Sequence, residues 1–342
     1  MEDIPLVLCR SMQPGDANIS GNVHGGTILK MIEEAGMIVG TRHCNVGGSD
    51  EGGSLCVLAR VERTDFLLPM YVGELAHLVA KVTFCSSHSV EVKVKVYAEN
   101  VLTGARRMTN SATLWYVPLK SKGVVADVPS MVLPSGENDA AGRERYERQK
   151  KERREINEVS PCLRDDWAML LDMPSQGHEP HTVGYAQSTL IHLVGVQDCG
   201  LQGIATGGFT MKLMDEVAGI CAVRHCHTNV VTASMDATNF HRSINKGNIL
   251  HFRSRPIFTS NKSLMIQVVV LVEERNRSRE AVNPSSVFCA CTAFFTYVSL
   301  DSQKKTIPVP TLKLTTPSDH ERFEEGKLRY EMQKKMRLTS QM

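Results

Sequence analysis

The chain has 342 residues, of which 42% are apolar, and its formal net charge at neutral pH is +2. This length accommodates two domains of ordinary size together with extensions. A net charge so close to zero gives no support for a general polyanion-binding role, so we expect no nucleic acid among the partners. The longest apolar runs, such as 268–272, are far too short to span a bilayer, so we expect no membrane span.

The ten cysteines include no Cys-x-x-Cys pair, and the chain opens with acidic residues rather than with a cleavable signal. We therefore expect reduced thiols and a cytosolic protein. No group of His, Cys, Asp or Glu has the spacing of a zinc site, so we expect neither a metal nor a cofactor.

In chain order, the first half begins with a strand-like segment at 6–12 and a Gly-Gly turn at 25–26. An apolar helix is predicted over 27–41, because its apolar residues recur at helical spacing. Several strands follow, the strongest at 90–96, where valines alternate with charged residues. Strands joined without crossover helices should pair antiparallel.

A linker over about 120–161 starts rich in Gly, Pro and Ser and becomes a charged helix from 139 onward. Residues 143–155 carry seven basic and four acidic side chains, several of them opposite charges at i, i+4 spacing. Such a helix is consistent with a phosphate or RNA contact, but its mixture of positive and negative side chains favours a solvated spacer helix. The segment from 319 onward predicts a second charged helix.

The second half of the chain repeats the first without gaps over residues 16–44, at a constant offset of 182 residues (from Asp16 to Asp198). The matched residues are Asp16, Gly21, Gly25, Gly26, Lys30, Glu34, Ile38, Arg42, His43 and Cys44, with Asp198, Gly203, Gly207, Gly208, Lys212, Glu216, Ile220, Arg224, His225 and Cys226. A period of this length is that of a duplicated domain, not of a solenoid repeat. A later stretch of the two copies matches at a smaller offset, so the first copy has extra residues between the two matched stretches. We expect these residues in the Gly-rich loop 47–54.

The second copy predicts strands at 185–194 and 264–272. One central helix wrapped by an antiparallel sheet is the hot-dog architecture, so the sequence predicts an α+β tandem (double) hot-dog. The expected divisions are a first hot-dog domain at 1–120, a linker at 121–165, a second hot-dog domain at 166–305 and an extension at 306–342.

The two copies differ at positions that carry chemistry. Asn22 is replaced by Ile204, and Glu33 is replaced by Asp215. A carboxylate in an apolar helix is costly unless it is solvated, paired or functional. Taken singly, Asp215 is compatible with a half-exposed helix residue and Asn22 with a helix cap. Hot-dog helices pair side by side, however, so Asn22 and Asp215 are predicted to meet across the interface and to form one live site per chain.

Gly25 and Gly26 leave backbone amides free at a helix start, where they can hold an oxyanion or a polarised carbonyl. A simple tight turn also explains them. His24 has Thr206 as its counterpart and therefore also differs between the copies. We expect it either to contact the ligand or to serve the structure. Cys44 and its neighbouring histidine recur in both copies, which favours packing over a nucleophile.

Two long segments, 21–36 and 211–219, carry a family resemblance, supported by 41–45, 258–263, 293–300 and 322–327. They resemble the two repeats of the cytosolic, brain-type acyl-coenzyme A thioesterases. The resemblance implies hydrolysis of long-chain fatty acyl-CoA to free fatty acid and CoA, without a cofactor. It also implies Asn22 and Asp215 as the catalytic pair, and a homo-oligomer that is a trimer of double hot dogs, or a hexamer of hot-dog domains.

The residues allow two other functions. One is a hot-dog enoyl-CoA hydratase or isomerase, and the other is a non-catalytic acyl-CoA sensor or scaffold. For the hydrolase we expect an amide near a Gly-Gly turn to polarise the thioester carbonyl. We also expect Asp215 to act as general base or nucleophile, and Asn22 to hold the water or the carbonyl. The acyl chain should lie in a channel between the domains.

Overall fold

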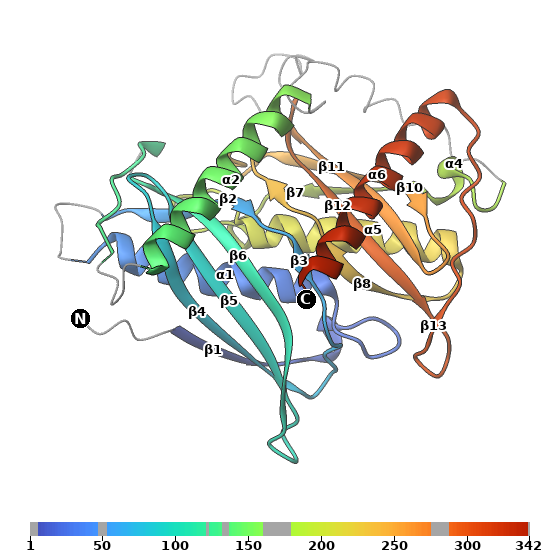
Figure 1. The fold of residues 1–342 in the computed structure, drawn as a ribbon, viewed down its shortest axis with the longest axis horizontal. Helices are drawn as coiled ribbons and strands as arrows, with labels where there is room; N and C mark the ends of the chain where they lie inside the picture. The colour runs from blue at the N-terminus through green and yellow to red at the C-terminus, as the bar shows by residue number, and fades with distance from the viewer. Residues whose placement is uncertain are drawn as a thin grey trace.

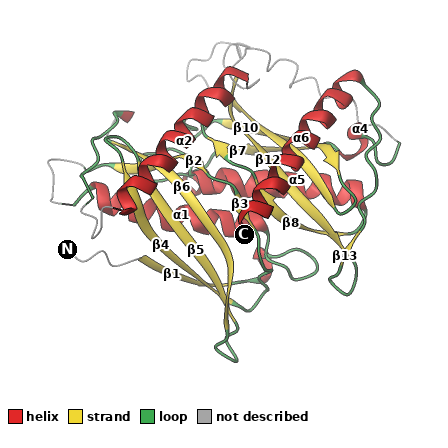
Figure 2. Cartoon of the chain, viewed as in Figure 1, coloured by secondary structure: helices red, strands yellow, loops and turns green. Residues whose placement is uncertain are grey.

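The computed structural model describes residues 6–46, 53–120, 123–131, 137–159, 179–274 and 287–340. Most of the expected insertion at 47–54 therefore lies outside the described residues. Each repeat consists of one long helix held against an antiparallel sheet, and a second helix lies on the outer side of each sheet (Figures 1 and 2). This arrangement confirms the predicted α+β double hot-dog.

The first sheet has its strands in the order β1, β4, β5, β6, β2, and all of these neighbours pair antiparallel. Their bounds are β1 (Leu6–Ser11), β2 (Leu55–Val61), β4 (Leu75–Cys85), β5 (Val90–Glu99) and β6 (Arg106–Leu119). The predicted strand at 90–96 is confirmed within β5, and its four valines are fully buried. Helix α1 (Gly25–Cys44) packs on this sheet and begins two residues before the predicted start.

The second sheet repeats this order as β7, β10, β11, β12, β8, with β13 added beside β12. Their bounds are β7 (Ser188–Leu193), β8 (Asn229–Met235), β10 (Ile249–Thr259), β11 (Ser263–Glu273), β12 (Val287–Leu300) and β13 (Thr306–Ile307), and helix α5 (Gly207–Cys226) packs on them. The prediction that a strand begins at Tyr185 was wrong. Residues Val183–Ala186 form the short helix α4, because the Thr182 hydroxyl caps it by accepting the N–H of Tyr185 at 3.2 Å.

Two short strands cross between the repeats and join the sheets. β3 (Thr64–Asp65) comes from the first repeat but pairs with β8 of the second. β9 (Thr238–Asn239) comes from the second repeat but pairs with β2 of the first. This reciprocal exchange fixes the two domains against each other.

Helices α1 and α5 contact each other, and each packs on the face of its own sheet that is turned away from the outer helix (Figure 1). At the start of each helix a glycine allows the other helix to approach. A Cβ atom placed on Gly26 would lie 2.8 Å from the carbonyl oxygen of Lys212, and one on Gly208 would lie 3.0 Å from that of Lys30. The Gly-Gly start of each helix therefore faces the helix of the other repeat, as the expected side-by-side pairing requires.

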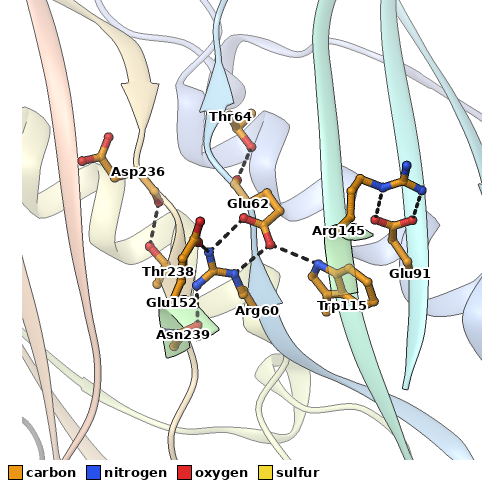
Figure 3. Close-up of polar contacts among 10 residues, drawn as sticks. All are labelled: Arg60, Glu62, Thr64, Glu91, Trp115, Arg145, Glu152, Asp236, Thr238 and Asn239. Carbon is orange, nitrogen blue, oxygen red and sulfur yellow. Dashed lines mark hydrogen bonds and ion pairs between the residues drawn. The ribbon is translucent and has the colours of Figure 1, made fainter. Parts of the chain in front are cut away.

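Helix α2 (Glu137–Val159) packs on the first sheet, so the expected solvated spacer helix was wrong. The ring of Tyr146 lies 5.9 Å from the rings of both Phe84 and Trp115. Arg145 binds the buried carboxylate of Glu91 through two nitrogens, at 2.8 and 2.6 Å (Figure 3). Aromatic packing and a bidentate ion pair place this charged helix on the sheet despite its polar composition.

A second contact of α2 involves Arg60 on β2, whose side chain is fully buried (Figure 3). Its guanidinium binds Glu62 at 2.8 Å, the α2 carboxylate of Glu152, and the Asn239 Oδ1 at 3.0 Å. Because Asn239 belongs to β9, one side chain connects the first sheet, the outer helix and the second repeat.

Helix α6 (Pro317–Ser340) takes the corresponding place on the second sheet, where Phe323 and Tyr330 contact Phe258 at ring distances of 5.1 and 5.3 Å. The sequence contains the same equivalence, because residues of α2 recur in α6 at constant spacing. They are Gly142, Arg145, Tyr146 and Gln149, with Gly326, Arg329, Tyr330 and Gln333. The repeated unit thus includes the outer helix.

In the part of the chain that the structure describes, eight cysteines are free thiols, as expected. Cys289 is disulfide-bonded, so the expectation of reduced thiols was wrong at that residue. Across the described residues, none of the helices combines the length and the apolar character that crossing a membrane requires.

Candidate active site

A cavity of about 1240 Å³ lies at the interface between the two repeats. The first repeat contributes Asn22, His24 and Gly25, which form the entry to α1. The second contributes Asp215 from α5 together with residues of β8 and β12. The cavity is therefore composite, as predicted from the differences between the copies.

Asp215 lines this cavity, is 3% exposed, and accepts three hydrogen bonds through its carboxylate. Its Oδ2 accepts the backbone N–H of Gly26 at 2.7 Å. Its Oδ1 accepts the Thr232 hydroxyl at 2.7 Å and the Tyr297 hydroxyl at 2.8 Å. These three donors come from α1, β8 and β12, so the carboxylate is held in one orientation.

The amide of Gly26 is thus not free to bind a substrate carbonyl, and that part of the expectation was wrong. The amide of Gly25 is different, because no hydrogen bond occupies it in the described part of the chain, and Gly25 lines the cavity. At the first position of α1 its N–H points out of the helix, where the positive end of the helix dipole adds to its effect.

Asn22 lines the same cavity and is 4% exposed. Its backbone N–H donates to the Asn18 Oδ1 at 3.1 Å, which fixes the chain before the helix. Its own Oδ1 is buried and has no hydrogen-bond partner among the described residues. An unpaired buried acceptor costs roughly 1–3 kcal/mol, so a hydrogen-bond donor that enters the cavity would stabilise this oxygen.

His24 lines the cavity but is exposed, and it precedes α1 without capping it through its side chain. Its counterpart Thr206 does cap α5, because its hydroxyl accepts the N–H of Phe209 at 3.2 Å. At this position the second repeat therefore has a helix cap, whereas the first repeat has an imidazole at the mouth of the cavity.

The reciprocal position is closed. Glu33 is buried beside Gly208 and does not line the cavity, and its burial raises its pKa to about 7. Leu58 occupies the place that Thr232 has in the second repeat, and its side chain packs directly on Gly207. Of the two symmetry-related positions, the Asp215 side is the one that opens into the large cavity.

Sequence reasoning missed Thr232, Tyr297 and Asn18 as members of this site. A comparison of the two copies could have found Thr232, because its counterpart Leu58 is apolar. It could also have found Asn18, because its counterpart is Gly200, which has no side-chain amide. Tyr297 carried no such signal, because Tyr116 matches it in the first repeat.

The rest of the cavity is mostly apolar, with basic groups toward solvent. Its apolar lining includes Ile28, Met70, Ile220, Val223, Val231 and Val298. Lys304 lies at the edge, with its amino group 4.1 Å from the centre of the Tyr71 ring. The described residues contain no group of three or more His, Cys, Asp or Glu placed to hold a metal ion.

Known proteins resemble this chain over most of its length. The family model described as the thioesterase superfamily matches residues 20–105 and 202–278, once in each repeat. The human cytosolic acyl coenzyme A thioester hydrolase is 53% identical over 94% of this chain and 81% of its own length. The rat protein of the same name is 52% identical over 95% of this chain and 82% of its own length.

Among solved structures, a Lactobacillus plantarum protein provisionally named oleoyl thioesterase covers 88% of this chain and 98% of its own, with a TM-score of 0.52. At 8% identity it supports the fold alone. The extent and the identity of the human and rat matches establish the family, and the chain belongs to the cytosolic acyl coenzyme A thioester hydrolases.

Proposed function

We propose that this chain hydrolyses the thioester bond of long-chain fatty acyl-CoA, giving free fatty acid and CoA, at one composite site per chain. The observation that carries the proposal is the position of Asp215, which comes from one repeat and is held by Gly26 of the other inside an interdomain cavity. The names of the human and rat relatives support the reaction class.

Water is the nucleophile in this mechanism, and two acceptors orient it. Oδ2 of Asp215 carries one hydrogen bond from the protein, whereas Oδ1 carries two, so Oδ2 retains the capacity to accept from a water molecule. Asn22 Oδ1 accepts the second hydrogen of the same water. As the water oxygen bonds to the thioester carbon, its proton passes to Asp215, which therefore acts as the general base.

The amide N–H of Gly25, at the start of α1, stabilises the negative charge that develops on the carbonyl oxygen. Collapse of the tetrahedral intermediate breaks the carbon–sulfur bond and releases the CoA thiol, which takes the proton from Asp215. His24, exposed at the mouth of the cavity, contacts the ligand outside the reacting atoms.

The shape and chemistry of the cavity support a long acyl chain attached to an anionic carrier. The apolar lining along α5, including Ile220 and Val223, suits the hydrocarbon. Lys304 and Arg224 also line the cavity and supply the positive charge that the phosphates of CoA need. Acyl-CoA thus fits both ends of the same cavity.

We further propose that the chain works in the cytosol as a homo-oligomer, a trimer of double hot dogs. Strand β7 is the edge strand of the second sheet among the described residues, and Ile191 and Leu193 on it are 62% and 54% exposed. Exposed apolar residues on an edge strand favour contact with another copy. Sedimentation should therefore give three chain masses, and a single chain mass at micromolar concentration would contradict the trimer.

The test of the reaction is thiol release from palmitoyl-CoA, with a no-substrate control for the protein's own thiols. Asp215→Asn should lose at least about 100-fold in kcat, whereas Glu33→Gln, the matched change at the closed position, should retain wild-type turnover. Equal activity of wild type and Asp215→Asn would exclude the assigned base. If wild type instead hydrates an enoyl-CoA, or binds acyl-CoA without releasing thiol, the hydratase or the sensor is correct.

A further inference from the structure

The hydroxyl of Tyr297 reaches two acceptors on the same residue. It lies 2.8 Å from the backbone carbonyl oxygen of Asp215 and 2.8 Å from Oδ1 of its carboxylate. Tyr297 is 3% exposed, and burial, followed by the nearby Asp215 charge, raises its pKa well above the ordinary value. The phenol therefore keeps its one proton, which the two oxygens share as acceptors of a bifurcated hydrogen bond.

The first repeat contains an internal comparison for this contact. Tyr116 occupies the equivalent place, is fully buried, and donates at 2.9 Å to the backbone carbonyl oxygen of Glu33. The bond from a strand tyrosine to a helix carbonyl is thus common to both repeats. Among the described residues, only the tyrosine of the second repeat also bonds the neighbouring carboxylate.

The difference follows from the length of the acidic side chain. Glutamate is one methylene longer than aspartate, and the carboxylate of Glu33 extends toward Gly208 of the other helix, from whose backbone it takes a hydrogen bond. Asp215 is shorter, so its Oδ1 stays beside its own helix, where Tyr297 and Thr232 both reach it.

We propose that Tyr297 is a positioning residue for the hydrolysis, and that it acts by holding the Asp215 carboxylate so that Oδ2 faces the attacking water. This inference rests on the proposed function. The shared bond to the helix carbonyl supplies the structural role of both tyrosines, and the additional bond to the carboxylate gives Tyr297 its role in turnover.

The experiment compares Tyr297→Phe with Tyr116→Phe, since both changes remove a buried hydroxyl and a bond to a helix carbonyl. Thiol release from palmitoyl-CoA should show kcat reduced about 10- to 100-fold for Tyr297→Phe, as expected for a misplaced reacting group. Its KM should change less than about 2-fold, and Tyr116→Phe should match wild type in both constants. Binding of a non-hydrolysable thioether analogue of palmitoyl-CoA verifies that each variant has a folded site.

A double-mutant cycle separates positioning from an independent effect. If Tyr297 acts through Asp215, the Tyr297→Phe/Asp215→Asn variant should be no slower than Asp215→Asn alone. Equal losses in the two tyrosine variants, unchanged kcat in Tyr297→Phe, or full additivity in the double variant would each overturn the inference. Lack of thiol release by wild type at every chain length would overturn the proposed function itself, and the inference with it.

Discussion

The carboxylate of Asp215 and the backbone N–H of Gly26 are 2.7 Å apart, although the two residues belong to different repeats of the chain. Gly26 lies in the first turn of α1, so the acid of the second repeat sits at the positive end of a helix of the first. The contact depends on the absence of a side chain at residue 26, because a Cβ atom there would lie 2.9 Å from the Cβ atom of Asp215.

Replacing Asp215 by glutamate, which is the residue of the first repeat, should keep the negative charge but displace it by one methylene. The carboxylate would then move away from the hydroxyls of Thr232 and Tyr297, and in the first repeat Tyr116 bonds the backbone carbonyl of Glu33 rather than its carboxylate. We expect kcat for palmitoyl-CoA to fall about 100-fold, a loss typical of a misplaced catalytic group. The converse variant, Glu33→Asp, serves as control and should retain turnover; activity near wild type in Asp215→Glu would mean that charge alone is needed.

Thr232 is predicted to act through its hydroxyl, which donates to Asp215 Oδ1 at 2.7 Å. Thr232→Val removes this donor with almost no change in volume, and we expect kcat to fall about 10-fold, the effect of losing one charge-assisted hydrogen bond of roughly 1.5 kcal/mol. Thr232→Ser keeps the hydroxyl and should stay close to wild type. If serine and valine behave alike in steady-state assays, the methyl group rather than the hydroxyl matters at this position.

The sequence predicted the parts of this fold that depend on local pattern. The duplication, the strand at 90–96 and the two helices after Gly-Gly turns follow from spacing and periodicity, and the structure confirms them. Asp215 stood out because its counterpart is glutamate and its helix is apolar. The sequence also predicts a single site per chain, since Ile204 has no side-chain amide, and this stays a prediction.

Contacts between distant segments were not predictable in the same way. The exchanged strands β3 and β9 have two residues each, too few for a periodic signal. The charge pattern of α2 indicated a solvated helix, because Arg145 finds its partner Glu91 only through the tertiary fold. Tyr297 looked equivalent to Tyr116 because the difference between them lies in the length of the neighbouring acid.

The buried guanidinium of Arg60 should make a large contribution to stability through its two carboxylate partners. The Glu62→Gln/Glu152→Gln variant leaves that charge buried without an ionised partner, which typically costs about 3–5 kcal/mol. Denaturant unfolding should show this loss, while turnover of the folded protein stays unchanged because Arg60 does not line the cavity. Glu179→Gln breaks the exposed pair with Lys313 and should cost less than about 1 kcal/mol. Equal costs in the two variants would contradict the role assigned to burial.

Glu33 should make the protein less stable as pH rises from about 4.5 to about 7. Burial raises its pKa in the folded protein to about 7 from an ordinary value of 4.5. Between these values the unfolded chain has released the proton and the folded protein still binds it, so the free energy of unfolding falls as pH increases. At about 1.4 kcal/mol for each pH unit, the full effect is about 3 kcal/mol and is complete above pH 7.

Chemical denaturation of wild type and Glu33→Gln between pH 5 and pH 8 measures this effect as a difference, because glutamine cannot ionise. The stability of Glu33→Gln relative to wild type should increase across this range and then level off. Glu34→Gln, at an exposed neighbour on the same helix, should show no such trend. Parallel curves for wild type and Glu33→Gln would mean that Glu33 ionises in the folded protein at its ordinary pKa, and that the closed half of the interface admits water.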